Sequence, residues 1–154
     1  MIITCHLLAG AAIVTKIHNP FLSFPLAFLS HYVLDFIPHI EYGTSPRRSI
    51  DGKINWISFF LKIGVDFLIG TLILLFISKN KVLALSGGFL GILGDFDNII
   101  FLFPALSKNK FLKSCTDFYK NKLHTTENKK FPLQVKILNQ IIIALIAIYF
   151  LQQP

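Results

Sequence analysis

The sequence predicts an all-α protein: a small polytopic bundle of about four to five membrane helices with an amphipathic cytoplasmic segment. Two observations lead to this fold class. Hydrophobic residues make up 53% of the 154 residues and charged residues only 15%, whereas a soluble domain carries about 25% charged residues. The apolar residues also gather in long blocks, several of them near the roughly 20 residues that a helix needs to cross a bilayer. We therefore expect a single integral membrane domain over residues 1–154.

Five apolar blocks define the expected helices. They cover approximately residues 2–15, 21–37, 56–77, 82–103 and 133–151. The first block is short for a spanning helix, so it either crosses the membrane or enters it and returns. Asn19-Pro20 separates the first block from the second, and Pro38 ends the second. Polar residues occupy the segments 39–55 and 104–132, which we expect to be loops.

The basic residues predict an orientation. If each block crosses once, the N-terminus and the loops 39–55 and 104–132 share one side, which then carries ten lysines and arginines. The other side carries only Lys16, Lys79 and Lys81. Because excess positive charge marks the cytoplasmic side, we expect a multi-pass protein with the loop-bearing side in the cytoplasm.

The 104–132 loop also predicts partners. Its lysines are interspersed with the aromatic residues Phe111, Phe118 and Tyr119. This pattern is typical of an amphipathic helix at a membrane surface. Such a segment contacts membrane lipids, and its lysines attract their anionic headgroups. We therefore expect lipid contacts and no nucleic-acid partner.

Three metal-capable residues, His31, Asp35 and His39, follow one another at four-residue spacing at the end of the second block. On an α-helix four residues turn through about 400°, so successive side chains are offset by only about 40° and share one face. Ionisable side chains at membrane depth are costly and usually face a protein interior or a water-filled site. This stripe therefore predicts a site that handles metal ions or protons.

The expected topology brings further polar residues to the same end of the bundle. They come from the first block, the late part of the fourth block and the 104–132 loop: His6, Asp95, Asp97 and His124. Together with the stripe they form the predicted set of metal ligands: His6, His31, Asp35, His39, Asp95, Asp97 and His124. Imidazole and carboxylate are the ligands of catalytic zinc, and also of iron and manganese sites.

Several members of this set have an alternative explanation. His6 alone is also compatible with an interfacial position near the N-terminus, and His124 with a solvated loop. Asp97 lies about 200° from Asp95 around a regular helix. Both carboxylates therefore bind one centre only if Gly94 loosens the helix; otherwise Asp95 is the ligand.

Asp66 lies near the middle of the third block, four residues after Lys62. This spacing favours an internal ion pair on one helix face. Alternatively, Asp66 reaches the cluster as a ligand or as the group that orients a histidine.

This chemistry predicts a membrane-embedded hydrolase that uses a divalent metal, with zinc as the favoured ion. A metal in such a site lowers the pKa of its bound water towards about 7 and polarises an ester or phosphoryl oxygen. The expected substrate is a phosphoester or another ester, such as that of a lipid, and the candidate general bases are Asp95 and Asp66. Two other classes stay open: a non-enzymatic protein that carries protons or metal ions through the same cluster, and a structural membrane anchor.

Three short motifs follow one another along the chain: Thr4-x-His6-Leu7-Leu8-Ala9-Gly10, Ala27-Phe28-Leu29-Ser30-His31-x-x-Leu34-Asp35-x-x-Pro38-His39, and Gly94-Asp95-x-Asp97. Their order resembles that of the membrane-bound metal-dependent hydrolase family. The His-x-x-x-Asp spacing is also similar to one in zinc-dependent phospholipase C, an all-helical phosphodiesterase. The resemblance implies that His31 and Asp35 bind metal and adds four further ligands: His6, His39, Asp95 and His124. The chain departs from the family pattern in carrying Gly94 where members often have proline, and it lacks a second clear His-x-x-x-Glu.

Overall fold

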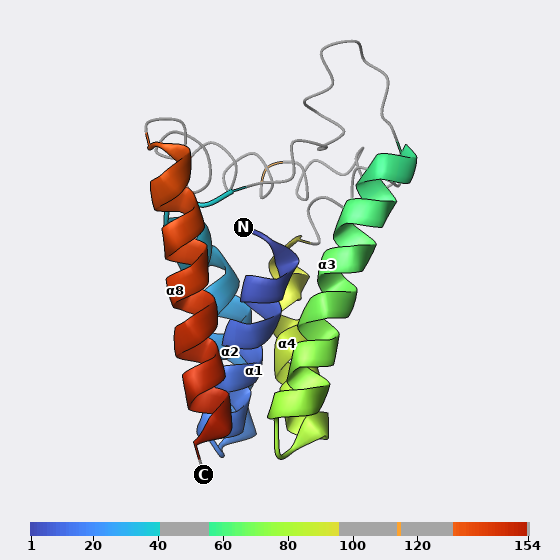
Figure 1. Ribbon diagram of the computed structural model, residues 1–154. Coiled ribbons are helices and arrows are strands. Elements are labelled where there is room, and N and C mark those ends of the chain that lie inside the picture. The colour runs from blue at the N-terminus through green and yellow to red at the C-terminus, as the bar shows by residue number, and fades with distance from the viewer. Residues whose placement is uncertain (41–55, 96–113, 115–130, 154) are drawn as a thin grey trace.

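The computed structural model describes residues 1–40, 56–95, 114 and 131–153. In these ranges its regular structure is entirely helical, which confirms the all-α class (Figure 1). The elements are α1 (Ile3–Lys16), α2 (Pro20–Asp35), α3 (Trp56–Ile77), α4 (Lys81–Ile92), the 3₁₀ turn η1 (Leu93–Asp95) and α8 (Leu133–Gln152).

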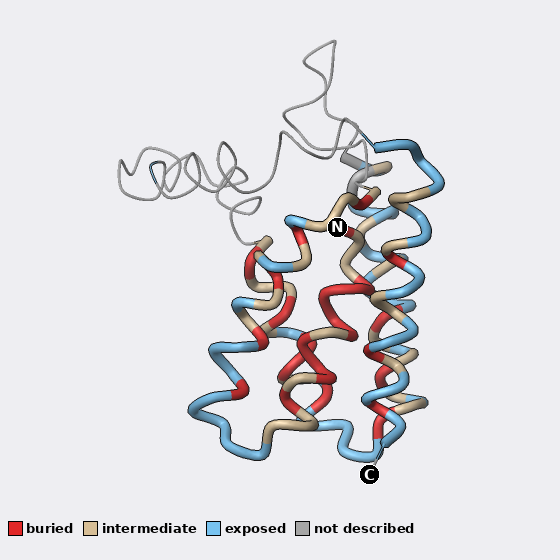
Figure 2. The backbone as a smooth tube through the Cα atoms, turned by 90° about the vertical axis from the view of Figure 1, so that its left-hand side faces the viewer, coloured by how far each residue is buried: buried red, intermediate tan, exposed pale blue. Residues whose placement is uncertain are grey.

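The shortest apolar block of the sequence forms the centre of the bundle. Helix α1 packs against α2, α3, α4 and α8, and nine of its 14 residues are buried. Figure 2 shows this central helix as the most continuously buried segment. At 1.5 Å per residue, 14 residues extend about 21 Å, less than the roughly 30 Å hydrocarbon core of a bilayer. Helix α1 is therefore a core helix that packs against four others.

Two of the described helices, α3 and α8, are long and apolar enough to cross a membrane. Only 11% of the apolar window in each is buried, unlike the core helix of a soluble protein. Helices α1, α2 and α4 have 14, 16 and 12 residues. The structure therefore supports two membrane-capable helices, and the prediction of four to five is not confirmed.

Glycines bring α1 and α4 into backbone contact. A Cβ atom added to Gly10 would collide with the carbonyl oxygen of Gly87, and one added to Gly91 would collide with the carbonyl oxygen of His6. Small residues at helix interfaces allow this close approach in membrane proteins. The contact matters for the site because it places the end of α4 directly beside His6.

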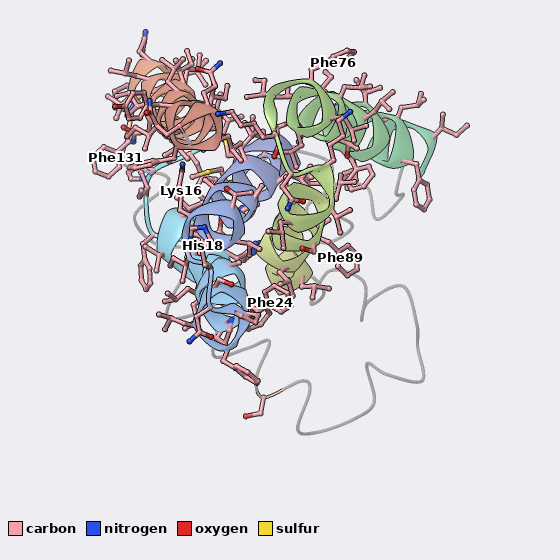
Figure 3. All side chains as sticks on the ribbon, turned by 90° about the horizontal axis from the view of Figure 1, so that it is seen from below. Lys16, His18, Phe24, Phe76, Phe89 and Phe131 are labelled. Carbon is pink, nitrogen blue, oxygen red and sulfur yellow. The ribbon has the colours of Figure 1, made fainter. Side chains whose placement is uncertain are left out.

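Large apolar side chains cover the outside of the bundle. Phe21, Phe76 and Val82 are among the most exposed, and Figure 3 shows Phe76 and Phe89 on its periphery. Extensive exposed apolar surface is rare on soluble monomers and marks contact with a membrane or a partner.

The helices alternate in direction, so the chain ends and connections gather at two ends of the bundle. The starts of α1, α3 and α8 lie at the upper end in Figure 1, and the N-terminus lies below the tops of α3 and α8. At the opposite end, Asn19 and Asn80 cap α2 and α4 by accepting hydrogen bonds from Phe21 N and Leu83 N. The start of the central helix therefore lies at the same end as the starts of α3 and α8.

Candidate metal centre

Asp35, at the last residue of α2, is the hub of a buried polar cluster. Its Oδ1 atom lies 3.3 Å from Nε2 of His6, and its Oδ2 atom lies 3.3 Å from Nε2 of His31. The terminal amino group of Met1 donates a hydrogen bond of 2.9 Å to Oδ1. The side chain of Asp35 is 2% exposed, and those of His6 and His31 are fully buried. Helices α1 and α2 thus present two imidazoles to one buried carboxylate.

Asp95 brings a second carboxylate to this cluster from η1. Its Oδ1 atom lies 3.9 Å from Nε2 of His31, and 37% of its side chain is exposed. Ligand atoms of His6, His31 and Asp95 all lie within 4.8 Å of one another, so this group can hold a metal ion. Solvent therefore reaches the cluster at Asp95, whereas the side chains of His6 and His31 are shielded from it.

The end of α4 fixes the orientation of His31. The Nδ1 atom of its ring lies 3.0 Å from the carbonyl oxygen of Gly91. Because a carbonyl oxygen only accepts, Nδ1 must carry the proton. In the neutral ring the lone pair is then on Nε2, which faces Asp35 and Asp95. Hydrogen bonds of this kind orient metal-binding histidines.

Gly94 makes room for that imidazole. A Cβ atom at this position would overlap Cγ and Cδ2 of His31. The backbone also tightens here from α-helix to the 3₁₀ turn η1. The sequence analysis expected Asp95 and Asp97 to bind one centre only if the helix loosened at Gly94, and the regular α-helix does end before this residue.

Buried imidazole nitrogens in the cluster lack hydrogen-bond partners within the described part of the chain. They are both ring nitrogens of His6 and Nε2 of His31. The two rings stack with centroids 4.0 Å apart and an interplanar angle of 24°. A buried polar atom without a partner costs about 1–3 kcal/mol, so the arrangement as it stands favours an additional cation or proton between these nitrogens and the carboxylates.

His39 joins the cluster by a different route from the one the sequence suggested. Helix α2 ends at Asp35, so His39 does not extend the helical stripe of His31 and Asp35. It is buried on the segment after the helix, where its Nδ1 donates to the carbonyl oxygen of Ile37 over 2.7 Å. Its Nε2 atom lies 3.9 Å from Oδ1 of Asp35. Pro38 accounts for the difference, because proline cannot continue the helix.

Asp66 contacts the start of α1. Its carboxylate accepts a 3.1 Å hydrogen bond from the backbone N–H of Thr4 and lies 2.6 Å from the Thr4 hydroxyl. Backbone N–H groups in the first turn of a helix have no partner within the helix. Asp66 therefore caps α1 from a neighbouring helix, and its predicted catalytic role stays a prediction.

Some of the predicted site lies outside the described residues: Asp97, His124 and, except for Ser114, residues 104–130 of the loop.

The structure adds two polar residues that the sequence analysis did not identify. Asn139 and Gln140 of α8 donate hydrogen bonds to the carbonyl oxygens of Pro38 and Ile40. Their signal in the sequence was an adjacent pair of amides inside an apolar helix.

The chain was compared with family models, curated proteins and solved structures. None of the three matches it. The resemblance to membrane-bound metal-dependent hydrolases therefore remains a prediction.

Proposed function

We propose that the protein is a membrane-embedded, zinc-dependent hydrolase of a phosphoester or ester bond in a lipid-like substrate. His6, His31, Asp35 and Asp95 would hold the metal. The observation that carries the proposal is the pair of buried Nε2 atoms of His6 and His31, which have no hydrogen-bond partner among the described residues and lie near the carboxylates of Asp35 and Asp95.

The hydrogen bond of His31 supports the presence of a cation or proton at the opposite ring nitrogen. With its proton on Nδ1, a neutral His31 directs a lone pair at the carboxylate oxygen of Asp35, 3.3 Å away. Two lone pairs at that distance repel each other, and burial removes the water that would screen them. A divalent cation relieves this repulsion and gives the nitrogens of His6 and His31 a partner.

The distances and the donor types fit zinc. Neighbouring ligand atoms of a tetrahedral zinc lie about 3.3 Å apart, since each lies about 2.0–2.1 Å from the metal. Both histidines have Nε2 at 3.3 Å from an oxygen of Asp35. Two imidazoles with carboxylates also form the donor set of catalytic zinc sites.

The exposure pattern favours catalysis over a purely structural site. Catalytic zinc sites keep one position open, whereas structural sites are closed. Here the histidines are fully buried and the Asp95 side chain is 37% exposed. A substrate would approach past Asp95, whose second oxygen is suited to accept a proton from water. Bound zinc would supply the polarisation of a phosphoryl or ester oxygen and make water more acidic.

The apolar exterior supports a membrane location and a lipid-like substrate. Exposed phenylalanines and aliphatic residues occur along α2, α3, α4 and α8. We further propose a multi-pass arrangement with the polar cluster at the cytoplasmic side, as the distribution of basic residues indicates. Lysines of the 104–132 loop would then attract anionic headgroups to the same side.

Metal analysis tests the proposal directly. The protein, expressed with zinc and purified in detergent, should contain stoichiometric zinc, and His31→Ala and Asp35→Ala should lose it. His18→Ala is the matched control, because His18 is exposed at the opposite end of the bundle. Absence of zinc from the wild type, or its retention in both site variants, would contradict the proposal. Hydrolysis of phosphodiester lipids in mixed micelles, measured with and without chelator, then tests catalysis.

A second candidate, proton transfer, is favoured by the three imidazoles that surround Asp35 within 3.9 Å. Protons would satisfy the same nitrogens. Vesicles reconstituted with the protein would then show proton flux that is lost in His31→Ala, without bound metal.

A further inference from the structure

Asn139 and Gln140 stand out on α8 because the part of this helix around them is apolar. From Ile137 to Leu151 the helix is otherwise hydrophobic except for Tyr149. Polar side chains in a membrane-capable helix are costly unless they find hydrogen-bond partners. The position of this pair therefore requires an explanation, and the proposed metal ligands do not include it.

Both amides bind the backbone of the segment that carries His39. Asn139 Nδ2 donates to the carbonyl oxygen of Pro38 over 2.9 Å, and Gln140 Nε2 donates to that of Ile40 over 3.0 Å. Both carbonyl groups lie beyond the end of α2, so no N–H group of this helix pairs with them in its regular hydrogen-bond pattern. The two donors therefore fix the chain one residue before His39 and one residue after it.

Fixing the backbone also fixes the imidazole. His39 is 1% exposed, and its ring donates from Nδ1 to the carbonyl oxygen of Ile37, two residues earlier. The opposite ring nitrogen points to Asp35, at 3.9 Å. Its direction thus depends on a short piece of backbone that α8 holds from outside.

Gln140 also connects α8 to the other side of the cluster. Its backbone carbonyl oxygen lies 3.6 Å from the thiol Sγ of Cys5, which precedes His6. One turn of α8 therefore contacts the segments that carry His39 and His6, more than 100 residues away in sequence.

We infer that Asn139 and Gln140 are positioning residues, which hold His39 against Asp35 in the proposed metal centre. The effect on metal binding rests on the proposed function. The effect on His39 does not, because the hydrogen bonds and the burial of its imidazole involve no metal.

The test uses the double variant Asn139→Leu/Gln140→Met, which removes both donors with little change in side-chain size. Gln134→Leu is the matched control, since Gln134 is an exposed amide on the same helix. Diethyl pyrocarbonate modification, followed residue by residue by mass spectrometry of the full-length protein in detergent, reports the accessibility of each histidine. Exposed His18 serves as the internal standard.

In the wild type and Gln134→Leu, His39 should be protected relative to His18. In the double variant, modification of His39 should approach that of His18, while helix content by circular dichroism is unchanged. Protection of His39 in the double variant would overturn the inference. If the double variant does not fold, Asn139→Leu and Gln140→Met are tested singly against the same criterion.

Cobalt(II) titration separates this inference from the proposed function. The double variant should bind cobalt about 10–100-fold more weakly than the wild type, as is typical when groups that support metal ligands are removed. Its visible absorption spectrum should also change. Unchanged affinity and spectrum would show that the pair does not support the centre, even though the wild type binds metal. If the wild type itself binds no cobalt, the proposed function fails, and His39 modification alone decides whether the pair positions His39.

Discussion

The Nδ1 atom of His31 donates a hydrogen bond to the carbonyl oxygen of Gly91, 3.0 Å away. This contact joins α2 to the last turns of α4 and directs the opposite ring nitrogen into the cluster. Gly91 also lies against the backbone of His6. Gly91 of α4 thus contacts both helices that carry the buried histidines, α1 and α2. The first prediction concerns this glycine.

Gly91→Ala should destabilise the fold. The added methyl group would collide with the His6 carbonyl oxygen, and backbone atoms cannot move aside as a flexible side chain can. Overpacking of this kind costs about 1–3 kcal/mol. Denaturant titration in detergent measures the change in free energy of unfolding. Gly64→Ala is the control, because a Cβ there has no described heavy atom within 4 Å. Equal stability of the two variants would contradict the described contact between α1 and α4.

Gly94→Ala should weaken metal binding. Its methyl group would overlap the ring of His31 and displace Nε2 from Asp35 and Asp95. We expect about a 10–100-fold loss of zinc affinity, the range seen when the supports of metal ligands are removed. Competition with a fluorescent zinc chelator measures it, again beside Gly64→Ala. Wild-type affinity in Gly94→Ala would mean that His31 is not a ligand in this orientation.

Zinc should stabilise the folded protein, and a chelator should reverse the effect. A ligand that binds only the folded state at 100 times its dissociation constant contributes about 2.7 kcal/mol. Thermal unfolding with added zinc, with magnesium and with chelator tests this, since magnesium prefers oxygen ligands. The shift should vanish in His31→Ala. A shift of equal size in that variant would place the bound zinc elsewhere.

Asp66→Ala should lower stability by about 1–3 kcal/mol, because it leaves the N–H of Thr4 without its acceptor. Asp66→Asn keeps one oxygen acceptor and should cost less. The same pair of variants separates a structural role from catalysis, since asparagine cannot act as a general base. Hydrolysis per bound zinc should be retained in Asp66→Asn if Asp66 only caps α1. Loss of turnover at full zinc occupancy and normal stability would instead assign the base to Asp66.

The sequence predicts those parts of the cluster that depend on local geometry. His31 and Asp35 share a helix face because the helical period alone fixes their relation. His39 follows the same spacing but lies beyond the end of α2, since Pro38 cannot continue the helix. Sequence spacing could not predict whether the chain after the helix would turn back to Asp35. That return depends on α8, which lies 100 residues further along.

The central position of α1 could not be predicted from hydropathy either. An apolar block of this length is equally compatible with a re-entrant segment, a short span or a core helix. Its contact with α4 at Gly10 and its packing against four helices distinguish the core helix in the structure. Asp66 illustrates the same limit, because its partner Thr4 is 62 residues away. A local sequence pattern cannot predict a hydrogen bond between residues so far apart in the chain.

The order of the helices has a consequence for biosynthesis. Helix α1 is synthesised before α8, which packs on it. The residues of α1 that α8 covers therefore lack this neighbour until residues 133–152 have been made, and chains terminated before residue 133 would expose them to lipid or to quality-control proteases.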